Sequence, residues 1–194
     1  MATYTANSLL DSTRKLASWR GTGYASTEGL RFVQCIPFAG MKTVVYEWHV
    51  KPSPIKRNKD GSFPKNVNKP SFYRVFLSFG DVQFAEEGDE IPSDNTWSLQ
   101  EYKGMKFYFQ KPAADKNPIR VSCTCPDYTI RGAYPNHKSG VHYGPLPKKV
   151  VRKTPAPPEG RPYVNPLNVP ILCKHEYACI ARSITEGWLL GKSM

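Results

Sequence analysis

The chain has 194 residues, of which 40% are hydrophobic and 12% aromatic, so it has enough apolar surface for one folded domain and is not a wholly disordered chain. It has no run of about 18 apolar residues and no basic stretch followed by an apolar one at the N-terminus, so we expect neither a membrane-spanning helix nor a secretory leader. The formal net charge of +11 favours a polyanionic partner, nucleic acid first, although an acidic neighbouring subunit would suit it equally well.

The first quarter of the chain predicts one helix followed by a pair of strands. Residues 7–19 form an amphipathic pattern that Asn7 or Ser8 could cap, and a glycine would end this helix. From residue 30 the apolar residues alternate with polar ones and are mostly β-branched or aromatic. This pattern predicts strands at 30–38 and 41–50, with a hairpin turn between them.

The middle of the chain predicts further strands separated by polar loops. Residues 51–70 are polar, basic and broken by four prolines, so they predict an extended arm that becomes ordered against a partner. Alternating apolar residues then return, and strands are expected at 72–79, 82–86, 106–110 and 119–124.

Residues 130–170 are the second predicted arm, because they carry little periodicity and a dense group of prolines. The candidate contacts of this arm with a polyanionic partner are Lys138, Lys148, Lys149, Arg152, Lys153 and Arg161. After it, residues 174–189 place apolar side chains at helical spacing and predict a C-terminal helix. The expected fold is α+β: a β-rich antiparallel sheet or barrel-like body, in a single domain spanning 1–194, with a helix at each end.

Two pairs of metal-binding side chains frame the second arm. Cys123 and Cys125 are separated by one residue, which puts both on the same side of an extended strand, and Cys173 and His175 repeat this spacing at the start of the last helix. The five cysteines are an odd number, and the clustering suits metal ligation in a reducing compartment better than disulfides. Structural zinc sites take four Cys or His ligands as two close pairs, so the sequence predicts one zinc site that links the strand end to the helix start.

These residues resemble a known family. The order C-x-C, a spacer and C-x-H, here CTC and CKH, is similar to the SWIM-type zinc finger, and the resemblance covers residues 119–190. The surrounding SCTCPDY and NPLNVPILCKHEYACI resemble a variant found in virion structural proteins of tailed bacteriophages, although the spacer here is longer and more basic than in the common finger. The resemblance implies a tail or baseplate component that is assembled in the host cytoplasm. Its implied partners are other virion subunits, in a symmetric homo-oligomer or ring.

Three further residues bear on the predicted site. Cys179 lies four residues after His175 and could replace it as the fourth ligand, and such an all-cysteine set would suit an iron–sulfur cluster. We favour zinc, and we expect Cys179 to be a small buried residue. Asp127 could hydrogen-bond the ring of His175 and orient it, or it could be an ordinary turn residue. Cys35 lies in a predicted strand and is expected in the core.

Three functional classes can be compared on these residues. Four protein ligands leave the metal no open position for water, and the chain contains no HExxH, G-x-S-x-G, P-loop or dinucleotide-binding motif, so we expect neither an enzyme nor a small-molecule substrate. The favoured interpretation is a virion structural component whose metal stabilises a body with long arms. The alternative is a nucleic-acid-binding zinc-finger module that uses the basic loop from Lys138 to Arg161, with tyrosines stacking on bases.

Overall fold

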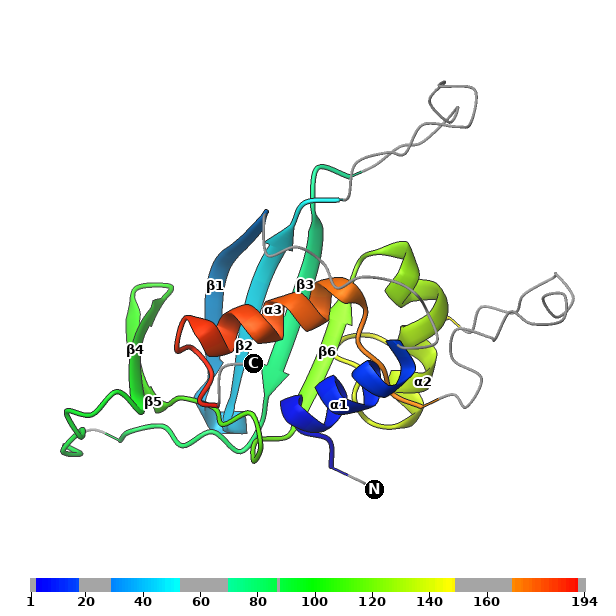
Figure 1. The fold of residues 1–194 in the computed structure, drawn as a ribbon. Helices are drawn as coiled ribbons and strands as arrows, with labels where there is room; N and C mark the ends of the chain where they lie inside the picture. The colour runs from blue at the N-terminus through cyan, green and yellow to red at the C-terminus, as the bar shows by residue number, and fades with distance from the viewer. Residues whose placement is uncertain (1–2, 18–28, 53–69, 87, 149–168, 192–194) are drawn as a thin grey trace, which may run out of the picture.

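The computed structural model describes residues 3–17, 29–52, 70–86, 88–148 and 169–191 (Figure 1). Most of the first predicted arm, residues 53–69, and half of the second, residues 149–168, lie outside this description. The described chain forms, in order, α1 (Ala6–Ala17), β1 (Leu30–Phe38), β2 (Thr43–Val50), β3 (Tyr73–Phe79), β4 (Trp97–Tyr102), β5 (Met105–Gln110), β6 (Ile119–Cys123), α2 (Ala133–Lys138) and α3 (Lys174–Thr185).

The architecture is α+β, as predicted, with two open antiparallel sheets. The larger sheet has four strands in the order β1-β2-β3-β6, and the smaller consists of β4 and β5 alone. Neither sheet closes into a barrel, so the barrel-like alternative is wrong. The helix α3 crosses one face of the larger sheet, while the β4–β5 hairpin lies beyond the β1 edge (Figure 1).

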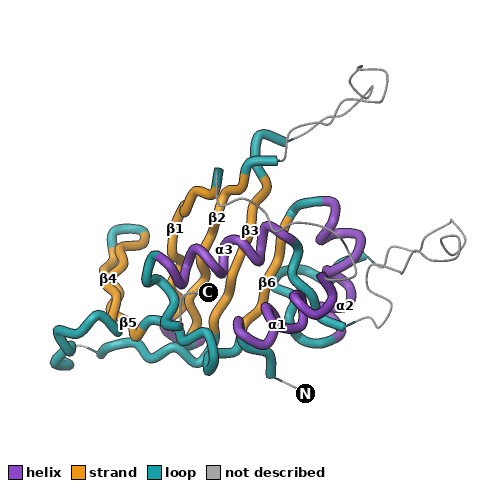
Figure 2. The backbone as a smooth tube through the Cα atoms, viewed as in Figure 1, coloured by secondary structure: helices purple, strands orange, loops and turns teal. Residues whose placement is uncertain are grey.

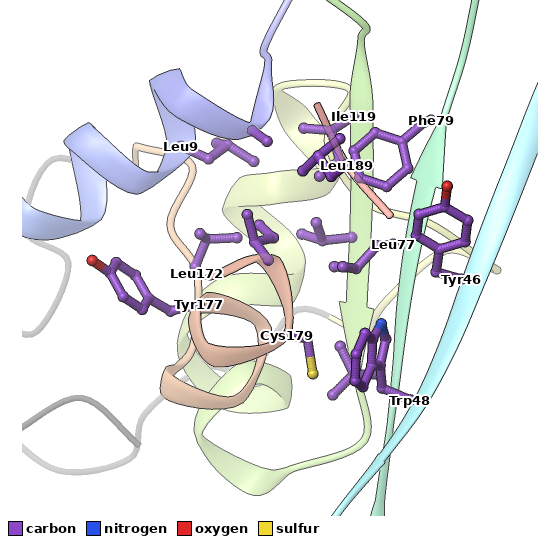
Figure 3. Close-up of a cluster of buried hydrophobic side chains, with 14 of the residues drawn as sticks. Leu9, Tyr46, Trp48, Leu77, Phe79, Ile119, Leu172, Tyr177, Cys179 and Leu189 are labelled. Carbon is purple, nitrogen blue, oxygen red and sulfur yellow. The ribbon is translucent and has the colours of Figure 1, made fainter. Parts of the chain in front are cut away.

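The hydrophobic core lies between the larger sheet and the two long helices. Alternate residues of the central strands point to this face, so that Tyr46 pairs with Leu77 and Trp48 with Val75 across β2 and β3. All four of these side chains are at most 2% exposed. Figure 3 shows Cys179 of α3 beside Trp48, with Leu9 of α1 on the opposite side of the same cluster.

The N-terminal helix is confirmed, but its cap differs from the prediction. The helix begins at Ala6, and Thr5 takes the capping position: the Ser8 amide donates to Thr5 Oγ1 over 3.3 Å, and the Thr5 amide donates to Ser8 Oγ over 2.9 Å. This reciprocal pair is a capping box with serine in the place usually held by glutamate. Thr5 also forms an isolated bridge with Pro118, just before β6.

Four features of the structure differ from the predicted elements. Residues 82–86 form no strand, only a single bridge from Phe84 to Phe109, and β4 was not predicted. The start of the second predicted arm is helical, with a π-helical turn at Tyr128–Gly132 that continues into α2. The last helix stops at Thr185 instead of residue 189, because Gly187 takes a left-handed conformation with φ of 71° and turns the chain.

None of the described helices is long and apolar enough to cross a membrane.

Candidate metal centre

The strand β6 delivers the first pair of predicted ligands to the core. Cys123 ends the strand opposite Val75 of β3, on the face that packs against α3. Cys125 follows two residues later, and both thiols are buried, at 5% and 1% exposure. The hydrogen bonds of β3 with Thr124 fix the strand end between them, because the Thr124 amide donates to Arg74 O over 3.0 Å and the Arg74 amide donates to Thr124 Oγ1 over 2.9 Å.

The start of α3 delivers the second pair. Cys173 is the N-cap of this helix, with extended backbone angles of −72° and 165°, and His175 lies in the first turn. Glu176 completes a capping box: its amide donates to Cys173 Sγ over 3.5 Å, and its Oε2 accepts from the Cys173 amide over 2.8 Å. One predicted ligand therefore also satisfies a free amide at the helix start.

The four predicted ligands come together in one buried group. The ligand atoms of Cys123, Cys125, Cys173 and His175 all lie within 4.8 Å of one another, and Cys123 Sγ is 3.8 Å from Nδ1 of His175. A zinc ion at tetrahedral bond lengths would separate two sulfurs by about 3.8 Å and a sulfur from a nitrogen by about 3.6 Å. The group is thus close to the size of a single metal coordination shell, and it could hold a metal ion.

Backbone amides also point at each of the three sulfurs. The Cys125 amide donates to Cys123 Sγ over 3.4 Å, and the Tyr128 amide donates to Cys125 Sγ over 3.3 Å. With the bond from Glu176 to Cys173, every thiol of the group accepts one backbone N–H. Such bonds stabilise negative charge on sulfur, which a metal-bound thiolate carries and a thiol does not.

Electrostatics within the group makes Cys125 the most acidic of its three thiols. The hydrogen bond from Cys123 lowers the pKa of the Cys125 thiol, and the same bond raises the pKa of Cys123. Burial raises the pKa of Cys173 well above its usual value. Three buried thiols cannot all ionise next to one another without a cation, so a divalent ion would replace the protons that they otherwise hold.

The ring of His175 is held by packing on its outer side. Its centroid is 5.0 Å from that of Tyr73, at an angle of 41°. Nε2 of His175 is buried and has no hydrogen-bond partner among the described residues, so the bond suggested from Asp127 to this nitrogen is not formed. Asp127 instead precedes the π-helical turn, which agrees with the alternative of a turn residue.

Cys179 and Cys35 lie outside the metal-binding group. Cys179 is fully buried, and Figure 3 shows its sulfur beside Trp48 in the core, so it takes the role of a small buried residue and not that of a fourth ligand. Burial raises the pKa of the Cys35 thiol to about 12, as expected for a thiol in an apolar setting.

Sequence reasoning missed Glu176 as part of this region. Its side chain is fully buried, burial raises its pKa well above the usual value, and only Oε2 has a partner, because Oε1 makes no hydrogen bond. The signal was present in CKHE, which is a capping box with cysteine in place of serine or threonine.

The predicted basic contacts are only partly described. Lys138, at the end of α2, and Lys148 are exposed, and the Lys138 ammonium lies 5.5 Å from the ring centroid of Tyr134. The remaining four, Lys149, Arg152, Lys153 and Arg161, lie outside the described residues.

Comparison of the chain with protein-family models, with curated protein sequences and with solved structures finds no match.

Proposed function

We propose that this chain is a structural component of a tailed-phage virion, in its tail or baseplate, and that a structural zinc ion stabilises its fold. The observation that carries the metal part of the proposal is the buried group of three cysteines and one histidine, which joins two segments about 50 residues apart. Four protein ligands complete a tetrahedral shell, so the ion would have no position left for water or substrate.

Zinc is the metal that these donors suit best. Thiolates and imidazole together select zinc among the common divalent ions, and a tetrahedral arrangement is the one zinc prefers. An iron–sulfur cluster would call for a fourth thiolate, and Cys179 lies apart in the core.

The virion role rests on the resemblance of CTCPDY and CKH, with their neighbours, to virion structural proteins. It agrees with a body that carries two long basic connections, which would become ordered on other subunits in a symmetric homo-oligomer or ring. In this role the metal supplies stability that a domain with long arms obtains less easily from its core.

Elemental analysis of protein purified without added metal tests the metal. We expect about one zinc per chain and no acid-labile sulfide. Iron together with sulfide and visible absorption would show that the group holds an iron–sulfur cluster and not zinc. A metal-free protein that is as stable as protein supplied with zinc would refute a metal in this group.

Mass spectrometry of purified particles of a phage that encodes this chain tests the virion role, with immunogold labelling to locate it. We expect its peptides at a stoichiometry comparable to that of tail proteins. Particles that lack the chain, while infected cells contain it, would show that it is not a virion component.

A further inference from the structure

The larger sheet buries one face and leaves the other without a covering helix among the described residues. The helices α1 and α3 pack on the core face, and α2 lies beside β6 at the sheet edge (Figure 2). Residues on the open face alternate with the core residues of the same strands, so that Glu47 of β2 faces Phe76 of β3, and His49 faces Arg74.

Aromatic rings follow β3 along this open face. Phe72 stacks on His49 with ring centroids 3.7 Å apart and an interplanar angle of 14°, and Phe72 remains 37% exposed. Further along the strand, the ring of Phe76 lies 5.7 Å from that of Tyr143. Between the two, Arg74 places its guanidinium 4.9 Å from the centroid of Phe76. Rings and a cation therefore alternate in one row.

The row of rings leads into a groove at the other end of the strand. The groove has a volume of about 660 Å³ and shares Tyr143 with the row. Its lining also includes the aromatic residues Tyr4 and Phe38, the apolar Val45, Ser78 and the exposed Arg120.

Two arginines of this face, Arg74 on β3 and Arg120 on β6, are exposed. Its central acid, Glu47, has a side chain only 4% exposed and accepts hydrogen bonds from Arg74 Nε over 2.9 Å and from Gln34 Nε2 over 2.8 Å, so its charge is neutralised locally. Asp81 stands at the rim of the groove, while Arg120 is exposed on β6.

We propose that this open face binds a single strand of nucleic acid, with bases stacked on the row of rings and phosphates paired with its arginines. Exposed rings stack on any base, and a basic surface that follows the backbone supplies the rest of the affinity without sequence preference. A duplex keeps its bases stacked inside and would offer these rings nothing to stack on. The site takes Tyr143 from the loop 138–161 but does not use the lysines of that loop, and the proposal is independent of the virion role.

Fluorescence anisotropy with labelled oligo-dT and oligo-U of about 12 nucleotides tests the proposal on the full-length, metal-loaded protein. We expect both single strands to bind and a duplex of equal length to bind more weakly. Phe72→Ala should weaken binding by about fivefold or more and leave the salt dependence unchanged, because it removes stacking alone. Arg120→Gln should lower the slope of log K against log salt by about 0.7, because it removes one phosphate contact.

Two exposed residues of the β4–β5 hairpin are matched controls. Tyr108 is as exposed as Phe72, at 37%, so Tyr108→Ala should leave binding unchanged, and Lys106→Gln should leave the salt slope unchanged. Circular dichroism and metal content establish that each variant is folded. Absence of binding at about 50 mM salt would overturn the proposal. A preference for duplex, or affinity that depends on Lys138 and Lys148 but not on Phe72, would overturn it equally.

Discussion

Removal of the metal is the perturbation for which the structure gives a magnitude. The four ligands form two pairs, at the end of β6 and at the start of α3, and the chain from Cys125 to Cys173 between them is 48 residues long (173 minus 125). A cross-link that closes a loop of this length removes chain entropy from the unfolded state worth about 4 kcal/mol. For a domain of this size, about 4 kcal/mol corresponds to a fall in Tm of about 8–16 °C.

The assay is thermal unfolding, followed by circular dichroism, of the metal-loaded protein and of the same protein after chelation. We expect the chelated protein to unfold at least about 8 °C lower, and an equimolar amount of zinc to restore the original Tm. The metal content of each sample is measured in parallel. A protein that has lost its metal but unfolds within about 2 °C of the loaded form would refute the argument that the ion links β6 to α3.

Two cysteine variants make the test specific for the ligands. Cys125→Ala should lose the metal and give a Tm that chelation no longer changes, because three ligands cannot complete the shell. Cys179→Ala removes an equally buried thiol that lies outside the group, so it should keep one metal per chain and the full response to chelation. Equal loss of metal in both variants would instead support an all-cysteine site.

Three further predictions concern other buried groups. Asn136→Ala should lower the free energy of unfolding, measured in urea, by about 3 kcal/mol. The reason is a pair of buried hydrogen bonds, because the Asn136 side-chain amide donates to Ile171 O and Asn136 Oδ1 accepts from the Ile171 amide, both over 2.9 Å. A loss below about 1 kcal/mol would contradict this. Burial raises the pKa of Glu47, but the hydrogen bonds from Gln34 and Arg74 outweigh burial, and the net effect is a pKa below the usual 4.5. The ionised Glu47 therefore stabilises the fold above about pH 4.5, and this stabilisation is lost as the pH falls through the folded pKa. Glu47→Gln should therefore be less stable than the original protein at neutral pH and lose less stability on acidification, and parallel acid unfolding curves would contradict this. Burial raises the pKa of Cys35 to about 12, so iodoacetamide at about pH 8 should label it only after unfolding; rapid labelling of the native protein would contradict its burial.

The buried Cys/His group could be predicted from the sequence because the positions of its four residues are set by local geometry. A C-x-C pair at a strand end and a C-x-H pair at a helix start each place two donors on one side without help from the rest of the fold. The strands β1, β2 and β3 were predictable for a related reason, since each presents alternate apolar residues to one buried face.

The elements that were missed lack such local signals. The hairpin of β4 and β5 turns at Lys103 and Gly104, with φ of 52° and 76°, and lysine is an uncommon residue in this left-handed position, where asparagine or aspartate would have marked a turn. The helical segment from Tyr128 to Lys138 contains Pro135 and a π-helical turn, both of which obscure helical periodicity. Asn136 instead fixes this segment by long-range bonds to Ile171, which no sequence window contains.

Charge balance explains why the group sits at the start of α3 and not within the helix. Three thiolates and a neutral imidazole around a divalent ion carry a net charge of about −1, which a buried site must offset. The amide of Glu176 and the positive end of the helix dipole face Cys173, while two more amides face Cys123 and Cys125. Burial raises the pKa of Glu176 well above its usual value, which opposes a second negative charge beside the group. Moving the ligands one turn further into α3 would remove the free amides that stabilise them, because those amides would bond along the helix.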